Sequence, residues 1–342
     1  MQTPVQELQD LRIPYVCLAS LKLKGTSTST GKKYIGGNRA FVRNAIREVI
    51  WQLKVKKELE PANQPSPDWA VVPNDIAYPF SKICKWFTKK KIPFLLFQEG
   101  IRFPLPNEEG GMPYGTNGAK EILTWGEASS RYFLNLGVKS KVVTAGNPRF
   151  DNIFNQKVKF ENNQIPFAKY NILYVSNPVD DQGFCSHDEK IRLFTTFVQS
   201  MKEMMDERDI HLFVRLHPRE DLESFKVAAA SITTNRIIWA QQFSLFEYLQ
   251  RMDLAIVLAS TVGLESMMVN VPIGVIKLPG HGYVFDYVQS GSAVGIDVDT
   301  DFKQSVWNAI TVDQSVLKEK SLAYVKTQLA NRGDSVTYIT NH

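Results

Sequence analysis

Short apolar runs alternate along this chain with longer stretches in which apolar residues recur every three or four positions. The runs predict strands, and the longer stretches predict amphipathic helices. In the first half the predicted strands are Pro14–Ala19, Trp69–Val72, Pro93–Phe97, Ile122–Trp125 and Val142–Ala145. The predicted helices there are Val5–Leu11, Ala40–Lys57, Tyr78–Lys89 and Glu127–Leu136. Strands that alternate with helices in this way indicate βαβ units and a parallel sheet.

A polar stretch, Asn155–Phe167, interrupts this alternation, which then resumes. The later predicted strands are Ile172–Val175, Leu212–Leu216, Ile237–Ala240, Leu254–Leu258 and Ile273–Ile276. The later predicted helices are His187–Arg208, Leu222–Ala229, Leu245–Arg251, Val262–Val269 and the tail Ser305–Leu329. We therefore predict an α/β protein with two Rossmann-like domains, residues 1–154 and 169–342, joined by a linker at 155–168. Two such sheets are expected to face each other across a cleft.

Composition and charge narrow the classes of function. The 342 residues are 44% hydrophobic and 22% charged, and the net charge is only +5. This mild excess does not predict a nucleic-acid partner; it suits a basic cleft for an anionic nucleotide or contact with an acidic membrane surface. Three dispersed cysteines predict a reducing compartment, and no apolar run has transmembrane length. We expect a cytoplasmic protein, with peripheral contact at the cytoplasmic face of the inner membrane left open.

Ligands of open α/β sheets bind beyond the carboxyl ends of the strands, so polar residues at those positions are the candidates for chemistry. Glu99 follows the predicted strand Pro93–Phe97 and precedes a glycine. Apolar surroundings would raise the pKa of its carboxyl group, which would suit it to take a proton from a hydroxyl. A surface carboxylate in a turn, or a partner for Arg102, is the alternative. Asp75, after strand Trp69–Val72, is a competing candidate base.

His217 ends a predicted strand, is followed by Pro218, and lies between Arg215 and Arg219. An imidazolium flanked by two guanidinium groups is suited to hold an anion such as a departing phosphate. A strand-end histidine bonded to a backbone carbonyl is the alternative.

Ser260 and Thr261 connect a buried strand to a helix. Their hydroxyls could cap the helix, and its free N–H groups could hold a phosphate. Glu265, one turn further, could bond ribose hydroxyls or stand in solvent.

Other strand ends complete the predicted nucleotide site. Ser176 and Asn177 follow the first strand of the second half, and Ala240 ends a later one. Ser186 and Glu189 fit a capping box. Acidic clusters at residues 180–181 and 297–301 could bind a divalent metal, but the latter more simply caps the helix at Phe302, and we predict neither a metal nor a cofactor. The glycine-rich segment Gly25–Gly37 lacks the spacing of a phosphate-binding P-loop.

Taken together, Gln98-Glu99-Gly100, His217-Pro218 and Ser260-Thr261 resemble the motif set of bacterial GT-B enzymes that use CMP-activated sugars. That group comprises the sialyltransferases, polysialyltransferases and β-Kdo transferases of capsule and lipopolysaccharide synthesis. Their pattern is an acidic pair before Gly, then His-Pro, then a Ser/Thr pair. Gly146–Asp151 and Ala259–Pro272 are similar to segments of the wider superfamily. The first acid of the pair is Gln98 here, which leaves the CMP-sugar assignment open.

The resemblance implies an inverting, metal-independent transfer of a nonulosonic acid or Kdo to a hydroxyl of a surface glycan or glycolipid. Glu99 would be the general base, and His217, Ser260 and Thr261 would contact the donor phosphate, with Arg215 or Arg219 assisting. One alternative is a UDP-sugar transferase or an enzyme like the UDP-GlcNAc 2-epimerases, although the five histidines are sparse for an epimerase. Another is a nucleotide-sugar-binding subunit without catalytic activity.

Overall fold

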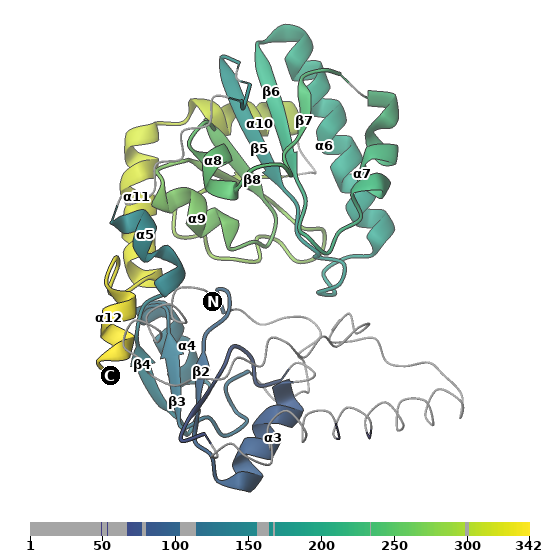
Figure 1. The fold of residues 1–342 in the computed structure, drawn as a ribbon. Coiled ribbons are helices and arrows are strands. Elements are labelled where there is room, and N and C mark those ends of the chain that lie inside the picture. Colours follow the sequence, from purple (N-terminus) through teal and green to yellow (C-terminus); the bar gives the residue numbers. More distant parts are fainter. Residues whose placement is uncertain are drawn as a thin grey trace. The chain divides into compact units, whose positions relative to one another are not determined.

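The computed structural model describes residues 67–76, 80–102, 114–155, 164–166, 168–232, 234–297 and 301–342, together with residues 49 and 53. These residues form two compact units, each with its own parallel sheet (Figure 1). The first unit takes the described residues up to Glu99, those between Asn107 and Arg149, and Asp334–His342. The second takes Gly100–Pro106 and Phe150–Gly333, as far as these are described. The predicted linker at residues 155–168 stays a prediction.

In the described part of the first unit, four parallel strands lie in the order in which they follow along the chain. They are β1 (Ala70–Val72), β2 (Phe94–Phe97), β3 (Glu121–Thr124) and β4 (Lys141–Thr144). Helix α3 (Phe80–Lys90) connects β1 to β2, and α4 (Glu127–Asn135) connects β3 to β4. Apolar side chains of both helices, among them Phe87 and Phe133, form one core with the strands. The periodic apolar face predicted for each helix is therefore the face that is buried.

The second unit has six parallel strands among its described residues, in the order β10-β9-β8-β5-β6-β7. They are β5 (Tyr170–Val175), β6 (Ile210–Arg215), β7 (Ile237–Trp239), β8 (Leu254–Val257), β9 (Ile273–Ile276) and β10 (Val294–Ile296). Counted along the chain, this is the 3-2-1-4-5-6 order of a doubly wound Rossmann sheet. The direction of winding reverses between β5 and β8, and ligands of such sheets bind at that point.

Helices cover both faces of the second sheet. They are α6 (His187–Glu207), α7 (Leu222–Ala229), α8 (Leu245–Leu249), α9 (Val262–Met268), α10 (Phe302–Thr311) and α11 (Gln314–Gln328). Apolar residues of α6, α7 and α10 join the strands in a continuous core. α9 packs on β8 and β9 and against α11, on the other face (Figure 1). The chain crosses to the other side of β5 on the connection from β7 to β8, and because parallel crossovers keep one hand, the helix after β8 lies on the other face.

Two predicted helix caps are confirmed. The Ser186 hydroxyl and the Glu189 carboxylate form a reciprocal capping box at the start of α6. The Asp301 carboxylate accepts the backbone N–H of Lys303 at the start of α10, so this acid caps a helix as expected. Each cap satisfies backbone donors that an isolated helix start leaves unpaired.

The tail predicted to be helical, Ser305–Leu329, is helical. Two helices, α10 and α11, occupy this region, and Val312 and Asp313 separate them. The Asp313 carboxylate accepts the backbone N–H of Ser315, so it caps the start of the second helix. The other predicted strands and helices that fall on described residues are present, with ends displaced by a few residues at most. The predictions for Val5–Leu11, Pro14–Ala19, Gly25–Gly37 and nearly all of Ala40–Lys57 lie outside the described residues.

The last residues of the chain return to the first unit. Helix α12 (Ser335–Thr340) belongs there, and its Ile339 packs against the apolar side chains of Leu123 and Val143 on the sheet. The terminal His342 ring nitrogen lies 2.8 Å from the Glu121 carboxylate at the start of β3. Such a short helix depends on tertiary packing, which explains why no sequence pattern predicted it. Within the described part of the chain, no helix combines the length and apolar character needed to cross a membrane.

Candidate functional site

The carboxyl edge of the second sheet gathers most of the predicted donor-side residues. Ser176, His217, Ala240 and Ser260 come within three residues of the ends of β5, β6, β7 and β8, which are adjacent strands of the sheet. Because these strands are parallel, the residues that follow them lie along one edge. This donor-side edge includes the point where the winding reverses.

Asn177 ties together the two loops at the reversal point. It is 5% exposed, and its side-chain amide donates to the backbone carbonyl of Ala259, 2.7 Å away, just beyond β8. The neighbouring Ser176 hydroxyl, also buried, donates to the Glu220 carboxylate at 2.8 Å. Both side chains therefore hold the shape of the edge. Any contact that they make with a nucleotide stays a prediction.

His217 lies in a tight turn that its own neighbours close. The backbone N–H of Glu220 donates to the His217 carbonyl at 2.9 Å, and the N–H of Arg219 donates to His217 Nδ1 at 3.1 Å. With Nδ1 accepting, the hydrogen of a neutral ring resides on Nε2. Burial lowers the pKa of the imidazole, and the charge of Arg219 lowers it further. These effects favour the neutral imidazole in the ligand-free protein, and the predicted role of His217 at a donor phosphate stays a prediction.

The two arginines beside His217 have different surroundings. The Arg215 guanidinium donates to the backbone carbonyls of Ala240 and Phe243 at 2.7 and 2.8 Å, and it lies 5.8 Å from the centre of the Tyr248 ring. It therefore braces the loop after β7. Arg219, in contrast, is exposed. Of the two predicted phosphate-binding arginines, Arg215 is hydrogen-bonded to backbone carbonyls and Arg219 is exposed to solvent.

Sequence patterns did not reveal a buried ionic network next to His217. The Lys190 side chain is 2% exposed and lies 2.5 Å from Glu220 Oε1 and 2.8 Å from Asp180 Oδ1. Asp180 also meets the ring of His187 at 2.9 Å. The Glu220 side chain is 4% exposed and reaches back to the backbone N–H of His217 at 2.7 Å. The only signal in the sequence was the position of Glu220 in the His-Pro turn.

At the end of β8, the two predicted hydroxyl residues play unequal parts. Ser260 Oγ accepts the backbone N–H of Val262 at 3.2 Å, whereas the side chain of Thr261, the N-cap residue of α9, makes no capping bond. Gly263 fits closely under a neighbouring ring, since a Cβ atom there would lie 2.7 Å from Tyr287. Glu265 is 2% exposed, which rules out the solvent-facing alternative. The phosphate role of Ser260 and Thr261 stays a prediction.

In the first unit, Gln98 and Glu99 follow β2 but differ in environment. Gln98 is 1% exposed; its side-chain amide donates to Ser129 Oγ at 2.8 Å, and its oxygen accepts the Trp125 N–H at 2.8 Å. This neutral amide locks β2 to the start of α4. Glu99 is exposed, and its backbone N–H donates to the Tyr114 hydroxyl at 3.2 Å.

Two neighbours of Glu99 complete the comparison of candidate bases. Gly100 has a φ of +70°, a conformation that favours glycine, which accounts for the Glu-Gly pair. Asp75, the competing candidate base, is fully buried. Its carboxylate accepts the backbone N–H groups of Gly115 and Asn117, at 2.9 and 3.0 Å. Asp75 therefore organises a loop, and Glu99 is the more accessible carboxylate.

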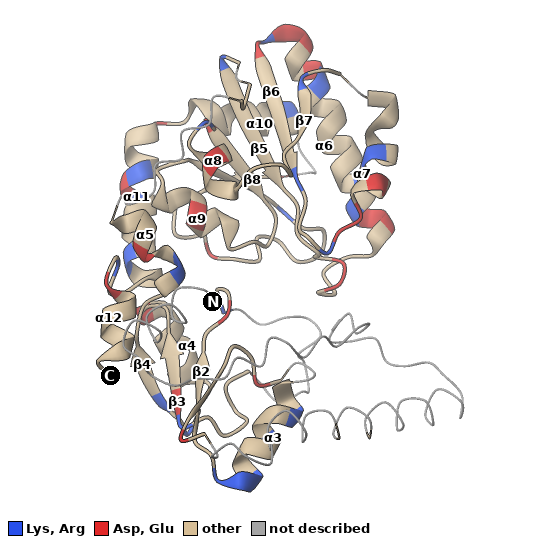
Figure 2. Cartoon of the chain, viewed as in Figure 1, with Lys and Arg blue, Asp and Glu red and all other residues tan. Residues whose placement is uncertain are grey.

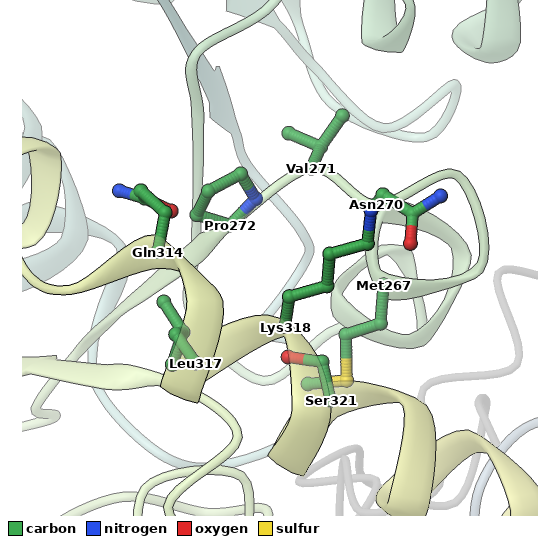
Figure 3. Close-up of a pocket in the computed structure, with 8 residues that line it drawn as sticks. All are labelled: Met267, Asn270, Val271, Pro272, Gln314, Leu317, Lys318 and Ser321. Carbon is green, nitrogen blue, oxygen red and sulfur yellow. The ribbon is translucent and has the colours of Figure 1, made fainter.

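A separate small cavity lies away from these residues. It measures about 70 Å³ and is bounded by the end of α9, the segment before β9 and the start of α11. Figure 3 shows Met267, Asn270, Pro272 and Lys318 around it. Because Pro272 directly precedes β9, this cavity is at the amino edge of the sheet, opposite the donor-side edge.

No protein-family model and no curated protein sequence matches the chain. Among solved structures, UDP-bound MnaA from S. aureus is similar over 88% of this chain and 80% of its own, with 14% identity and a TM-score of 0.61. The UDP-GlcNAc 2-epimerase of Methanocaldococcus jannaschii, in complex with UDP-GlcNAc and UDP, is similar over 98% and 86%, with 18% identity and a TM-score of 0.59. The wall teichoic acid polymerase TagF is similar over 74% and 68%, with 15% identity and a TM-score of 0.50. At these identities the likeness is one of fold.

The fold class is confirmed. The chain is an α/β protein with two parallel sheets, consistent with the two Rossmann-like domains of GT-B enzymes. The predicted meeting of Glu99 and His217 across a cleft stays a prediction.

Proposed function

We propose that this protein is an inverting glycosyltransferase that uses a CMP-linked sugar, a nonulosonic acid or Kdo, to extend a bacterial surface glycan. Glu99 takes the proton from the acceptor hydroxyl, whose oxygen attacks the anomeric carbon in line. The bond from that carbon to the phosphate oxygen breaks, and CMP leaves with the electron pair. His217 Nε2–H and the Ser260–Thr261 segment stabilise the charge that develops on the phosphate.

The observation that carries this proposal is the environment of His217. A backbone N–H occupies Nδ1, so the neutral ring has its hydrogen on Nε2 and can donate it. The ring lies beyond the carboxyl end of β6. Only β5 separates this strand from the reversal point of the 3-2-1-4-5-6 sheet. A fixed hydrogen-bond donor at such an edge is suited to an anionic oxygen of a nucleotide.

The supply of positive charge favours a single phosphate over a diphosphate. Two carboxylates neutralise Lys190, and backbone carbonyls occupy Arg215, which leaves Arg219 as the exposed cation next to His217. Around the start of α7 and its neighbouring loops, both signs of charge are interspersed (Figure 2). The Arg219 guanidinium together with the hydrogen bond from neutral His217 can stabilise a departing nucleoside monophosphate, whereas the greater charge of a diphosphate calls for more cations or a metal.

Glu99 is proposed as the base because it is the exposed carboxylate next to Gly100, whereas Asp75 is buried and bonded to backbone N–H groups. The substitution of Gln98 for the first acid of the family pattern does not remove this group. Gln98 donates from one side of its amide and accepts on the other. We infer that this position is structural in this protein.

The fold likeness to UDP-GlcNAc 2-epimerases supports a second candidate, an enzyme that acts on a UDP-linked sugar. Such an enzyme would need several acid and base groups around the sugar. Of the described histidines at this edge, His217 follows β6, His187 is bonded to Asp180, and His281 in the loop after β9 contacts the Phe184 ring; the nearby Glu220 is engaged with Lys190. A binding subunit without catalytic activity would leave the accessible Glu99 without a role.

Hydrolysis and transfer assays with CMP-, UDP- and CDP-linked donors test the proposal. We expect turnover of a CMP-linked sugar and a loss of transfer of about 100-fold or more in Glu99→Gln, because a general base contributes roughly 10²–10⁴ in rate. Glu127→Gln, which changes another exposed carboxylate of the first unit, is the matched control. Turnover of UDP donors alone would favour the epimerase-like candidate, and unchanged transfer by Glu99→Gln would refute the mechanism.

A further inference from the structure

The Glu220 carboxylate connects three elements of the donor-side edge. Its Oε1 accepts from the Ser176 hydroxyl at 2.8 Å, at the end of β5, and lies 2.5 Å from Lys190 Nζ in the first turn of α6. Its Oε2 accepts the backbone N–H of His217 at 2.7 Å, at the end of β6. Both oxygens are therefore used, and each partner belongs to a different element.

The turn that contains His217 depends on this carboxylate. The Glu220 side chain holds the N–H of His217 while the Glu220 N–H holds the carbonyl of the same residue, so the turn is closed from both sides. Within this closed turn the Arg219 N–H donates to Nδ1 of the ring. Glu220 thus determines that Nε2–H is the polar group of His217 left for a ligand, although Glu220 itself need not touch the ligand.

Lys190 provides the charge that Glu220 requires. A carboxylate with 4% exposure is costly unless it is paired, and the Lys190 ammonium pairs it with Asp180 on its other side. A buried ion pair of this kind is weak evidence for stability, because apolar residues of similar volume often serve as well. Its position beside the candidate donor site suggests a different role.

We propose that Lys190 and Glu220 form a positioning pair, which presents His217 Nε2–H and the β5 loop to the donor phosphate. This inference rests on the proposed function for the identity of the ligand, but the geometry of the turn can be tested without a ligand. The pair is distinct from the catalytic groups, since both side chains are buried and bonded to groups of the protein.

The charges that face His217 allow the effects of the two residues to be separated. Arg219 and Lys190 lower the pKa of the imidazole, whereas Glu220 and Asp181 raise it. Loss of Lys190 therefore raises the pKa of His217, and loss of Glu220 lowers it. These opposite shifts follow from the charges alone and accompany any change in the position of the ring.

The first experiment observes the tautomer of His217 in the ligand-free protein. Long-range proton–nitrogen NMR correlations of the ¹⁵N-histidine-labelled chain are recorded across pH, and His217→Ala assigns the signal. We expect a single Nε2–H tautomer in the wild type and a mixture of tautomers in Glu220→Ala. Glu223→Gln, an exposed glutamate at the start of α7, is the control and should keep the single tautomer. A single tautomer in Glu220→Ala would overturn the proposal.

If Glu220→Ala does not fold, Glu220→Gln replaces it. Glutamine offers one acceptor oxygen where glutamate offers two, so it can serve either His217 N–H or the Lys190 side, and a mixture of tautomers is again expected. A single Nε2–H tautomer in this variant would overturn the proposal equally.

The second experiment measures donor hydrolysis by Lys190→Met and Lys190→Arg. We expect kcat to fall by about 100-fold in Lys190→Met with a smaller change in KM, because a misplaced group loses contacts with the developing charge. Lys190→Arg keeps the charge and should recover part of the rate. Lys202→Met, on the exposed face of the same helix, is the matched control. A folded Lys190→Met with unchanged kcat would overturn the proposal. If the wild type hydrolyses no donor, the proposed function fails, and the NMR experiment still decides the positioning role.

Discussion

Replacing Lys190 by methionine removes a buried ammonium while keeping a side chain of similar length. In the wild type this group pairs with Glu220 at 2.5 Å and Asp180 at 2.8 Å, and the side chains of the three are 2%, 4% and 17% exposed. The variant leaves two neighbouring, largely buried carboxylates without a counter-charge. Breaking a buried pair in this way costs about 3–5 kcal/mol. For a unit of this size, that corresponds to a decrease in Tm of roughly 6–20 °C.

The assay is thermal unfolding at several pH values, followed by circular dichroism, with Lys202→Met as the control. Burial opposes ionisation of Asp180, but hydrogen bonds from Lys190 and His187 outweigh it and lower the pKa. A carboxylate whose pKa is lower in the folded state than in the unfolded state stabilises the fold at pH values above the unfolded-state pKa. This stabilisation is lost as the pH falls through the folded-state pKa. The deficit of Lys190→Met should therefore be largest near neutral pH and shrink at about pH 4 and below.

A double variant separates stability from positioning. Lys190→Met combined with Glu220→Leu replaces both charges by apolar groups, and such replacements often recover the lost stability. We expect a partial recovery of Tm relative to Lys190→Met, because Asp180, the Ser176 hydroxyl and the His217 N–H remain without these partners, together with a low rate of donor hydrolysis. A loss of less than about 1 kcal/mol in the single variant, or a loss independent of pH, would refute the reasoning about this buried pair.

Three further predictions follow from particular contacts. His217→Ala should lower kcat/KM for donor hydrolysis by about 100–1000-fold, as loss of an oxyanion donor does, while His342→Ala in the first unit should leave it unchanged. Gly263→Ala should lower the free energy of unfolding by about 1–3 kcal/mol, because its Cβ would lie 2.7 Å from the Tyr287 ring; a thermal scan with an unchanged Tm would contradict this. Asp75→Ala should destabilise the first unit by about 2 kcal/mol or more, because it strands backbone N–H groups that bond a buried carboxylate, and calorimetry would detect the loss.

The elements near the site were predictable because their signals are local. The capping box of Ser186 and Glu189 lies within four consecutive residues, and the helix and strand periods repeat within each segment. His217 and Ser260 could also be selected in advance. In a parallel sheet, every residue that directly follows a strand reaches the same edge, whatever the order of the strands.

The boundary between α10 and α11 is a detail that the apolar spacing did not locate. Apolar positions continue through Ser305–Leu329, so spacing predicts helical structure there without marking where one helix ends. The extended backbone of Val312 and the cap from Asp313 end one helix and start another. Asp is favoured at helix starts, but it also occurs on exposed helix faces, so its presence alone does not mark a boundary.

The sequence by itself determined the alternation of strands and helices, the caps, and the polar residues that follow each strand, because these depend on neighbours along the chain. The tertiary structure decided that β5 lies between β6 and β8, and so joined Asn177 to Ala259 across 82 positions. It also decided which charges remain for a ligand: Arg215 and Lys190 are engaged, and the His217 ring is neutral. Pairing and burial set these properties, and both arise only when distant segments are brought together.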